Sequence, residues 1–438
     1  MPQHTPTSPL YSTPSSPWHC GPYVFDLSLP LVMGIVNVTP DSFSDGGEHD
    51  TPGAAVSHAM RLVAEGADII DVGGESTRPG STPPSIDEEI ARTADIVREL
   101  SSRGIPVSID TRHARVARAA LDVGACVVND VSGFRDAAMR DVLAASDAGA
   151  VVMHMRGEPG HMQDDPAYDD VVAEVESYLL SQADLLVASG IARERICLDP
   201  GIGFGKTHAH NAALLDATSR LASHGMPLMV AVSRKSFIGE VSGIEAPADR
   251  DAASALCAAS ACFDGARIAR VHDVSGTARA LNDSRRAALS LGSNVGDGPA
   301  HLDAAIRALS RERGVWISRV SAYVRSEPAY RTDQPVFTNA AALVQTTLSP
   351  LELLDALHRI EALEGRVRTI PNAPRTLDID IVDYAGVVAD DVDFTLPHPR
   401  AAERAFVVEP LLEISPGHVL ADGTALDASR ARVGRLIG

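Results

Sequence analysis

The sequence predicts an α/β TIM (β/α)8 barrel followed by an α+β ferredoxin-like domain. Its 438 residues are too many for one ordinary hydrophobic core, so two domains are expected. Eight apolar runs rich in Val and Ile alternate with amphipathic segments between about residues 30 and 280, which matches the strand count of a TIM barrel. After about residue 281 the order changes to β-α-β-β-α-β, which is typical of the ferredoxin-like arrangement.

The eight expected barrel strands are apolar runs joined by helical crossovers. Parallel strands require such crossovers, and the amphipathic segment 86–100 opens with a capping box of Ser85 and Glu88. The strands are expected at residues 31–38, 67–73, 106–110, 126–130, 150–155, 196–200, 227–233 and 266–272.

Composition limits the partners and the compartment. Acidic side chains outnumber basic ones by 58 to 38, a formal net charge of −20, which disfavours nucleic acid as a partner. The five cysteines form no C-x-x-C pair, and unpaired thiols suit the reducing cytoplasm. No apolar run reaches membrane-spanning length, so no membrane partner is expected. Residues 1–25, rich in Pro, Ser and Thr, are expected to form a disordered leader.

Polar side chains end all eight predicted strands. One such residue would reflect only the greater wetness of strand ends, but eight of eight indicate a ring at the C-terminal face, where barrel enzymes bind their substrates. In chain order the ring consists of Asn37, Asp71, Asp110, Asn129 with Asp130, His154, Asp199, Ser233, and Arg270 with His272.

Cations follow strands two, seven and eight. Arg78 lies beyond paired glycines whose backbone N–H groups can turn toward an anion, and its guanidinium can add a bidentate clamp. Lys235 follows strand seven, while Arg270 and His272 are two apart on strand eight and so share one side. In an acidic protein this placement predicts an anion pocket; an ordinary ion-pair cluster is the alternative.

Acids and an amide on other strands predict a second half of the same site. Asp110, Asn129 and Asp199 can accept paired hydrogen bonds from a flat heterocycle that carries several N–H groups. A structural network of buried polar groups is the alternative.

Residues 201–207, GIGFGKT, resemble a phosphate-binding P-loop, but Pro200 replaces its first glycine, so that function is not predicted. His208 and His210 have metal-like spacing without a third ligand nearby. We interpret them as a solvated helix start.

Seven motifs over roughly residues 30–280 resemble the dihydropteroate synthase family: NVTPDSFSDGG, DVGGESTRPG, SIDT, VVND, LDPGIGFGK, SRKS and RVHDV. The resemblance implies a barrel at residues 26–281 that condenses 6-hydroxymethyl-7,8-dihydropterin diphosphate with p-aminobenzoate and releases diphosphate. It implies Lys235, Arg270 and His272 as catalytic residues. The binding residues that it implies are Asp110, Asn129, Asp199 and Lys235 for the pterin, Thr77, Arg270 and His272 for the diphosphate, Asn37 for Mg²⁺, and Phe204, Arg78 and Ser236 for p-aminobenzoate.

Near the C-terminus, residues 376–381 read TLDIDI and alternate strictly. Asp378 and Asp380 therefore share one face of a strand, where two like charges repel unless a cation lies between them. Mg²⁺ takes one or two carboxylates together with nucleotide phosphates. A half-exposed strand without a metal is the alternative. Cations suited to phosphates follow nearby, namely Arg366, Arg368, Arg375, His398 and Arg404.

Four motifs resemble the 6-hydroxymethyl-7,8-dihydropterin pyrophosphokinase family over residues 287–425, in a domain expected to span 287–438: LGSN, FTN, EALEGRVR and APRTLDIDI. The family transfers a diphosphoryl group from ATP to the pterin alcohol. Its catalytic lid, here residues 369–374, lacks the Trp and the extra basic residue common in the family, and whether this change lowers kinase turnover is left open by the sequence. The implied residues are Asp378 and Asp380 for two Mg²⁺, Arg366 and Arg375 for catalysis, Phe337, Phe406 and Asn339 for the pterin, and Glu361, Arg368, His398 and Arg404 for the nucleotide.

The two resemblances support each other, because the product of the C-terminal reaction is the substrate of the N-terminal one. We therefore expect a bifunctional folate-biosynthesis enzyme that uses ATP and Mg²⁺, acts on small molecules and forms a homodimer through the barrel. Two alternatives stay open: a synthase barrel whose C-terminal domain only binds pterin, and a pterin-dependent methyltransferase barrel, which would lack the diphosphate cations.

Overall fold

The computed structural model describes residues 16–38, 52–76, 82–157, 161–164, 166–329, 333–366, 373–391 and 394–437. The chain divides into two compact units, with the division between Asn282 and Asp283 for all but a short segment, Val241–Gly243. Within the described residues, no helix combines the length and the apolar character needed to cross a bilayer.

The N-terminal unit is a nearly closed barrel of parallel strands. Its eight strands are ordered β8-β7-β6-β5-β4-β3-β10-β9. A parallel bridge between Leu198 of β8 and Leu228, just before β9, joins the two edge strands of that order. The predicted TIM barrel is therefore confirmed. The strands are β3 (Leu31–Asn37), β4 (Ile69–Gly73), β5 (Val107–Asp110), β6 (Val127–Asp130), β7 (Gly149–Met153), β8 (Ile196–Asp199), β9 (Met229–Val230) and β10 (Ile268–Val271).

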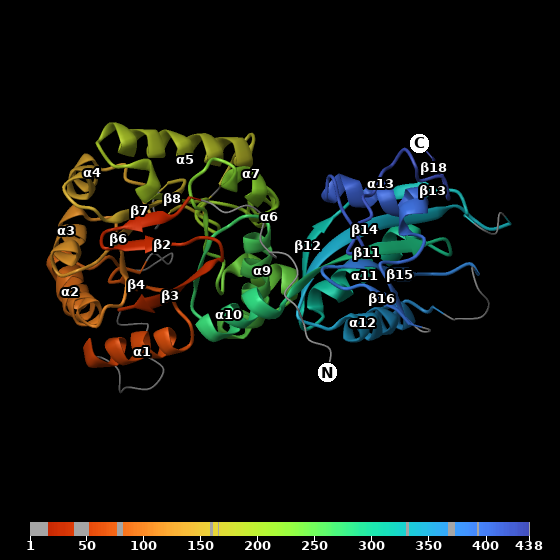
Figure 1. Ribbon diagram of the computed structural model, residues 1–438, viewed down its shortest axis with the longest axis horizontal. Coiled ribbons are helices and arrows are strands. Elements are labelled where there is room, and N and C mark those ends of the chain that lie inside the picture. The colour runs from red at the N-terminus through yellow and green to blue at the C-terminus, as the bar shows by residue number, and fades with distance from the viewer. Residues whose placement is uncertain are drawn as a thin grey trace. The chain divides into compact units, whose positions relative to one another are not determined.

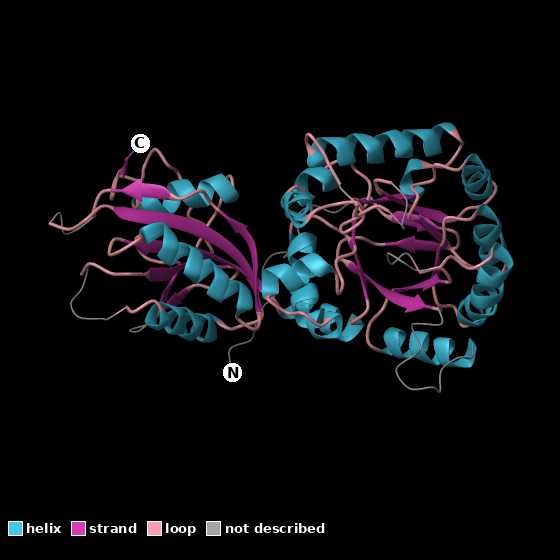
Figure 2. Ribbon diagram, turned by 180° about the vertical axis from the view of Figure 1, so that it is seen from behind, coloured by secondary structure: helices cyan, strands magenta, loops and turns pink. Residues whose placement is uncertain are grey.

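Helices form an outer ring around these strands (Figures 1 and 2). The capping box predicted at Ser85 and Glu88 is present at the start of α2, where each residue bonds the other's backbone N–H. The helices are α1 (Pro52–Ala64), α2 (Ile86–Ser102), α3 (Ala114–Asp122), α4 (Ala137–Ala144), α5 (Val171–Ala188), α6 (His208–Asp216), α7 (Thr218–Ala222), α8 (Ser236–Ser242), α9 (Asp251–Phe263) and α10 (Val274–Asp283).

A hairpin closes the N-terminal end of the barrel and corrects one expectation. Strands β1 (Trp18–Cys20) and β2 (Tyr23–Phe25) pair antiparallel. Trp18 is fully buried against the first residues of the barrel strands, among them Met33 and Ile69, and its Nε1 donates a hydrogen bond to the Arg195 carbonyl at 2.9 Å. The disordered leader predicted for residues 1–25 is therefore wrong from Trp18 onward, because aromatic burial outweighs the polar composition. Residues 1–15 lie outside the described part of the chain.

The C-terminal unit is an antiparallel sheet with the predicted β-α-β-β-α-β order. Its strands follow the order β15-β11-β14-β13-β18, and β12 also pairs with β14. Two separate strands lie between α11 and β14. Helix α12 opens with a capping box of Ser349 and Glu352. The elements are β11 (Arg285–Ser293), α11 (Gly298–Arg311), β12 (Val315–Val320), β13 (Val324–Ser326), β14 (Phe337–Thr346), α12 (Pro350–Leu363) and β15 (Asp378–Tyr384).

Helices cover both faces of this sheet. Leu302 of α11 and Leu357 of α12 pack with Leu289 on one face. Val408 of α13 (Ala405–Ile414) packs with Leu343 on the other. The sheet is therefore buried in its middle, and its strand ends remain available for a site. The other strands are β16 (Ala389–Asp390), β17 (Thr395–Leu396) and β18 (Leu436–Ile437).

Candidate active sites

The C-terminal ends of the barrel strands hold one connected polar network. Arg270 at the end of β10 pairs through Nε with Asp71 Oδ2 at 2.6 Å and through Nη2 with Asp110 Oδ2 at 2.6 Å. Asn129 Nδ2 donates to Asp71 Oδ2 at 3.1 Å. Arg270 and Asn129, on two strands, therefore meet at the fully buried carboxylate of Asp71, and Asp110 on a third strand joins them through Arg270. Asp71 was predicted as a strand end but not as a site residue, and its polarity on an apolar strand was the available signal.

Asp199 and Lys235 lie in the same buried region. Asp199 is 2% exposed, and its Oδ1 accepts a hydrogen bond from the Gly201 N–H at 2.8 Å. Lys235 Nζ donates to the Ile202 carbonyl oxygen and lies 4.6 Å from the centre of the Phe204 ring. The expected pterin and p-aminobenzoate residues are thus neighbours here.

Burial shifts the pKa values of the acids and of the lysine in this network in opposite directions. It raises the pKa of Asp199, which Lys235 opposes, and it raises the pKa of Asp110, which Arg270 opposes. It lowers the pKa of the Lys235 ammonium to about 8. A ligand with several N–H donors would stabilise the ionised form of such desolvated acids.

His272 lies beside Ser233 at the same end of the barrel. Its Nδ1 is 3.0 Å from Ser233 Oγ, and its backbone N–H donates to that oxygen at 3.1 Å. Ser236 begins α8, with Oγ 3.5 Å from His208 Nε2. Arg234 is paired with Asp251 at 2.7 Å, so it belongs to the scaffold of the loop.

Asn37 ends β3 and faces Asp110 across Gly73. A Cβ at Gly73 would lie 3.5 Å from Asp110 Cβ and 3.6 Å from Asn37 Oδ1. The absence of a side chain at Gly73 therefore leaves the amide oxygen of Asn37 open toward the polar network. Thr77 and Arg78, also predicted for this site, lie outside the described residues.

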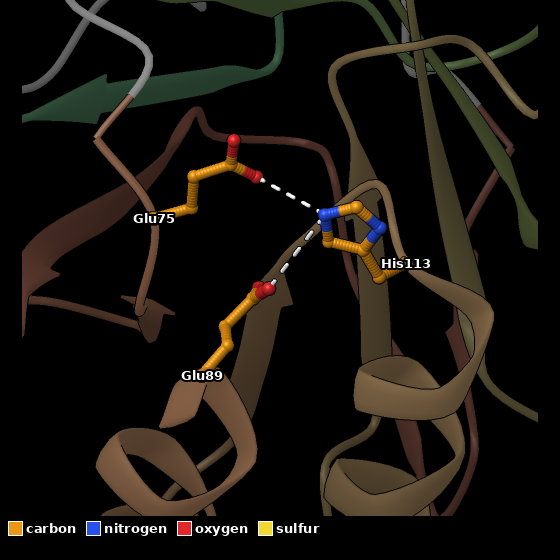
Figure 3. Close-up of side chains that lie close together, drawn as sticks. All are labelled: Glu75, Glu89 and His113. Carbon is orange, nitrogen blue, oxygen red and sulfur yellow. Dashed lines mark ion pairs between the residues drawn. The ribbon is translucent and has the colours of Figure 1, made fainter. Parts of the chain in front are cut away.

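An ion-pair cluster beside this site was not predicted. His113 Nε2 lies 3.5 Å from Glu75 Oε2 and 4.0 Å from Glu89 Oε2 (Figure 3). Their ligating atoms lie within 4.8 Å of one another, which is compatible with a cation. Glu75 is already paired with Arg112 at 2.9 Å, and Glu89 accepts from Thr111 Oγ1 at 2.7 Å. We interpret the cluster as a tie between the loop after β4, helix α2 and the loop after β5.

The C-terminal unit has a cavity of about 220 Å³. Asp378 and Asp380 of β15 both line it, as the alternation predicted. Residues that the sequence did not indicate line it too, because strand register places Gly292 beside Asp378 and Ser290 beside Asp380. The full lining consists of Ser290, Gly292, Ser326, Ala329, Gln334, Phe337, Asn339, Arg366, Arg375, Asp378, Asp380, His398, Arg404 and Phe406.

Arginines surround the two aspartates of the cavity. Arg366 bonds Asp378, and Arg375 pairs with Asp378 at 3.0 Å. Arg404 lies 3.7 Å from Asp380. Burial, and then the charge of Asp378, raises the pKa of Asp380, which is the electrostatic setting that a divalent cation relieves.

Aromatic rings and an amide complete the cavity. Arg375 lies 5.6 Å from the centre of the Phe337 ring, and Arg404 lies 5.7 Å from that of Phe406. Asn339 Nδ2 donates to Ser326 Oγ at 2.9 Å. Burial, followed by the charge of Arg404, lowers the pKa of His398 to about 4, so this imidazole is neutral at pH 7.

Glu361 lies behind this cavity rather than on its wall. Its side chain is 2% exposed, accepts from the Ile379 N–H at 2.8 Å and pairs with Arg366. Glu361 thus contacts a cation of the cavity wall, and its expected role toward the nucleotide stays a prediction. Arg368 and residues 369–372 of the expected lid fall outside the described part of the chain.

Comparisons with known proteins match the two units separately. Residues 33–272 match the family described as pterin binding enzyme, and residues 288–416 match that of 7,8-dihydro-6-hydroxymethylpterin-pyrophosphokinase. The dihydropteroate synthase of Neisseria meningitidis serogroup C is 46% identical over 268 residues, which are 60% of this chain and 95% of that protein.

Solved structures agree with the match of the barrel. Xanthomonas albilineans dihydropteroate synthase with 4-aminobenzoic acid is 44% identical, with a TM-score of 0.58, and the match covers 61% of this chain and 96% of that one. Burkholderia cenocepacia dihydropteroate synthase complexed with 7,8-dihydropteroate is 43% identical, with a TM-score of 0.57, covering 62% of this chain and 96% of that one.

Proposed function

The chain belongs to the pterin binding enzyme family and carries a pyrophosphokinase domain in the same polypeptide. We propose which of its residues act in each of two consecutive reactions. It is a bifunctional folate-biosynthesis enzyme. The C-terminal domain transfers diphosphate from ATP to 6-hydroxymethyl-7,8-dihydropterin, and the barrel condenses the product with p-aminobenzoate to give 7,8-dihydropteroate. These matches favour neither the methyltransferase nor the binding-only alternative. We assign the synthase domain to residues 18–281 and the kinase domain to residues 287–438.

In the synthase, Asp110, Asn129 and Asp199 hold the pterin, with Lys235 beside them. The observation that supports the synthase function most strongly is that Arg270 pairs with both Asp71 and Asp110, each at 2.6 Å. The buried carboxylate of Asp71 and the partly buried one of Asp110 fix the guanidinium before any substrate binds, so little reorganisation is needed when charge develops on the leaving diphosphate.

The leaving diphosphate meets Arg270, His272 and Thr77. Ser233 orients the His272 ring through Nδ1. We assign Asn37 as a ligand of Mg²⁺, because its amide oxygen is a hard donor that faces the polar network across Gly73. When bound, that cation would neutralise charge on the diphosphate. Phe204, Ser236 and Arg78 border the p-aminobenzoate site, and Phe204 excludes water from it.

In the kinase, the cavity of about 220 Å³ accepts the pterin between Phe337 and Phe406, with Asn339 at the ring edge. Asp378 and Asp380 fit Mg²⁺, because they present two carboxylates on one strand face, where burial and then the charge of Asp378 raise the pKa of Asp380. When bound, Mg²⁺ would neutralise charge on the phosphates of ATP. The phosphates also meet cationic side chains, and Glu361 positions one of these, Arg366. The remaining phosphate-facing residues are Arg368, Arg375, His398 and Arg404.

We also propose a cytoplasmic homodimer that acts on small molecules and binds neither nucleic acid nor membrane. The five unpaired, buried cysteines suit a reducing compartment. The dimer follows from the resemblance of the barrel to its family. Light scattering should then give twice the chain mass of 46.1 kDa, and a monomer would contradict the dimer.

The assignment of the pterin site is tested on the full chain. Lys235→Ala removes the cation beside Asp199, so dihydropteroate formation from supplied pterin diphosphate should fall by about a hundredfold or more. AMP release from ATP and the pterin alcohol should continue at the wild-type rate, which shows that the variant is folded. Intact synthase turnover in this variant would refute the assignment.

A further inference from the structure

Lys206 is a buried lysine that neither reaction uses directly. The residue is 3% exposed. Its Nζ lies 2.9 Å from His154 Nδ1, 3.0 Å from the carbonyl oxygens of Gly201 and Phe204, and 3.3 Å from that of His154. An ammonium group has three protons, so all of them are directed at protein acceptors. These acceptors come from the segment just after β7 and the loop just after β8.

The loop after β8 packs tightly because of its glycines. Gly201 has φ +65°, and a Cβ there would clash with the His154 carbonyl oxygen. Gly203 has φ +82°, and a Cβ there would lie 3.0 Å from Lys235 Cδ. The GIGFG run, which superficially resembles a P-loop, therefore serves close backbone approach. Its inward carbonyl groups need a donor, and Lys206 supplies it.

The same loop holds two groups of the synthase site. The Gly201 N–H donates to Asp199 Oδ1 at 2.8 Å. The Ile202 carbonyl oxygen accepts from Lys235, whose Nζ lies 4.6 Å from the centre of the Phe204 ring. A shift of residues 201–204 would therefore move the ring of Phe204 and release the ammonium of Lys235 together.

The neighbouring charges are consistent with this arrangement. Burial, and then the charge of Lys206, lowers the pKa of His154 to about 3. His154 is thus neutral at pH 7, and its Nδ1 must be the unprotonated nitrogen in order to accept from an ammonium. Burial lowers the pKa of Lys206 to about 7, although the charge of Asp199 raises it, so the ammonium form predominates below pH 7.

We propose that Lys206 is a positioning residue of the synthase reaction, whose ammonium fixes residues 201–204 and thereby places Lys235 and Phe204 at the p-aminobenzoate site. This inference rests on the function proposed for the barrel. It goes beyond a role in folding alone, because it predicts a selective effect on the second substrate.

The test uses Lys206→Met in the full-length chain, with kcat and KM measured for p-aminobenzoate at saturating pterin diphosphate. Loss of a charge-assisted hydrogen bond predicts about a tenfold rise in that KM, with a smaller change in kcat. AMP release by the C-terminal domain should be unchanged. Lys206→Gln keeps two donors without the charge and should give an intermediate KM.

Tyr168→Phe provides a matched control. Tyr168 OH donates to the Gly205 carbonyl oxygen at 2.8 Å, so this variant removes a hydrogen bond to the adjoining residue of the loop but leaves the contacts of Lys206. Its KM for p-aminobenzoate should stay within about twofold of wild type. Wild-type kinetics in Lys206→Met would overturn the proposal. So would loss of the barrel fold in both Lys206 variants, judged by circular dichroism, because Lys206 would then serve folding alone. Absence of dihydropteroate with the wild-type chain would instead refute the function of the barrel.

Discussion

Replacing Arg270 with Met should destabilise the barrel strongly, because it leaves one buried and one partly buried carboxylate without their cation. Asp71 is fully buried, and Arg270 and Asp110 have exposed side-chain fractions of 17% and 18%. Breaking a buried pair of this kind by removing one partner costs about 3–5 kcal/mol. For a barrel of this size the midpoint of thermal unfolding should fall by roughly 6–20 °C.

The loss should depend on pH in a definite direction. Burial raises the pKa of Asp110, and Arg270 opposes the rise, so the variant should have a higher pKa at Asp110 than the wild type. An acid whose pKa is higher in the folded than in the unfolded state stabilises the fold at low pH and loses that contribution as pH rises. The stability difference between wild type and Arg270→Met should therefore be smaller at pH 5 than at pH 8.

Scanning calorimetry of the full chain at pH 5, 6, 7 and 8 measures both effects. Arg115→Met is the matched control, because Arg115 and Asp87 pair at 2.7 Å with side chains that are 65% and 80% exposed. Loss of such an exposed pair costs at most about 1 kcal/mol. If Arg270→Met unfolds at the same temperature as Arg115→Met, or if its deficit is the same at every pH, the buried network is not what holds this site.

Three further predictions concern the ends of the barrel and the two sites. Trp18→Ala should lower the free energy of unfolding by about 3–5 kcal/mol in urea titrations, because it opens a cavity under the barrel and loses the bond to Arg195; an unchanged midpoint would mean that the hairpin is dispensable. Synthase kcat/KM should fall above about pH 8, as Lys235 loses its proton, and Lys235→Arg should lack this fall; a retained fall would assign it to another group. Removal of Mg²⁺ with EDTA should stop AMP release, and added Mg²⁺ should restore it; release that continues in EDTA would refute the metal role of Asp378 and Asp380.

The sequence predicted the barrel well because its strands are buried on both faces and so read as continuous apolar runs. It failed at Trp18–Phe25, since two three-residue strands in a Pro- and Ser-rich stretch carry too few residues to show alternation. The burial of Trp18 depends on strand starts spread over more than 200 residues, which local patterns do not reveal.

The site residues also divide into those that local patterns predict and those that depend on distant strands. Asp378 and Asp380 were predicted because two-residue alternation fixes their common face. The pairing of Asp71 with Arg270, 199 residues away, was not, because it depends on which barrel strands stand near each other. Lys206 lies in the run that resembles a P-loop, and its contact with His154 was not predicted because it joins loops that follow two different strands. Motif resemblance supplied the residue roles that geometry alone leaves open.

The central claim is that one chain performs two consecutive reactions at separate sites, and mixing two inactive variants tests it most directly. Lys235→Ala and Asp378→Asn are each incubated with the pterin alcohol, ATP, Mg²⁺ and p-aminobenzoate, alone and together. Each variant alone should form no dihydropteroate, whereas the mixture should form it, because Lys235→Ala supplies the pterin diphosphate that Asp378→Asn consumes. Full activity of either variant alone would contradict the account. So would a mixture that is as inactive as its parts, provided that Asp378→Asn turns over supplied pterin diphosphate.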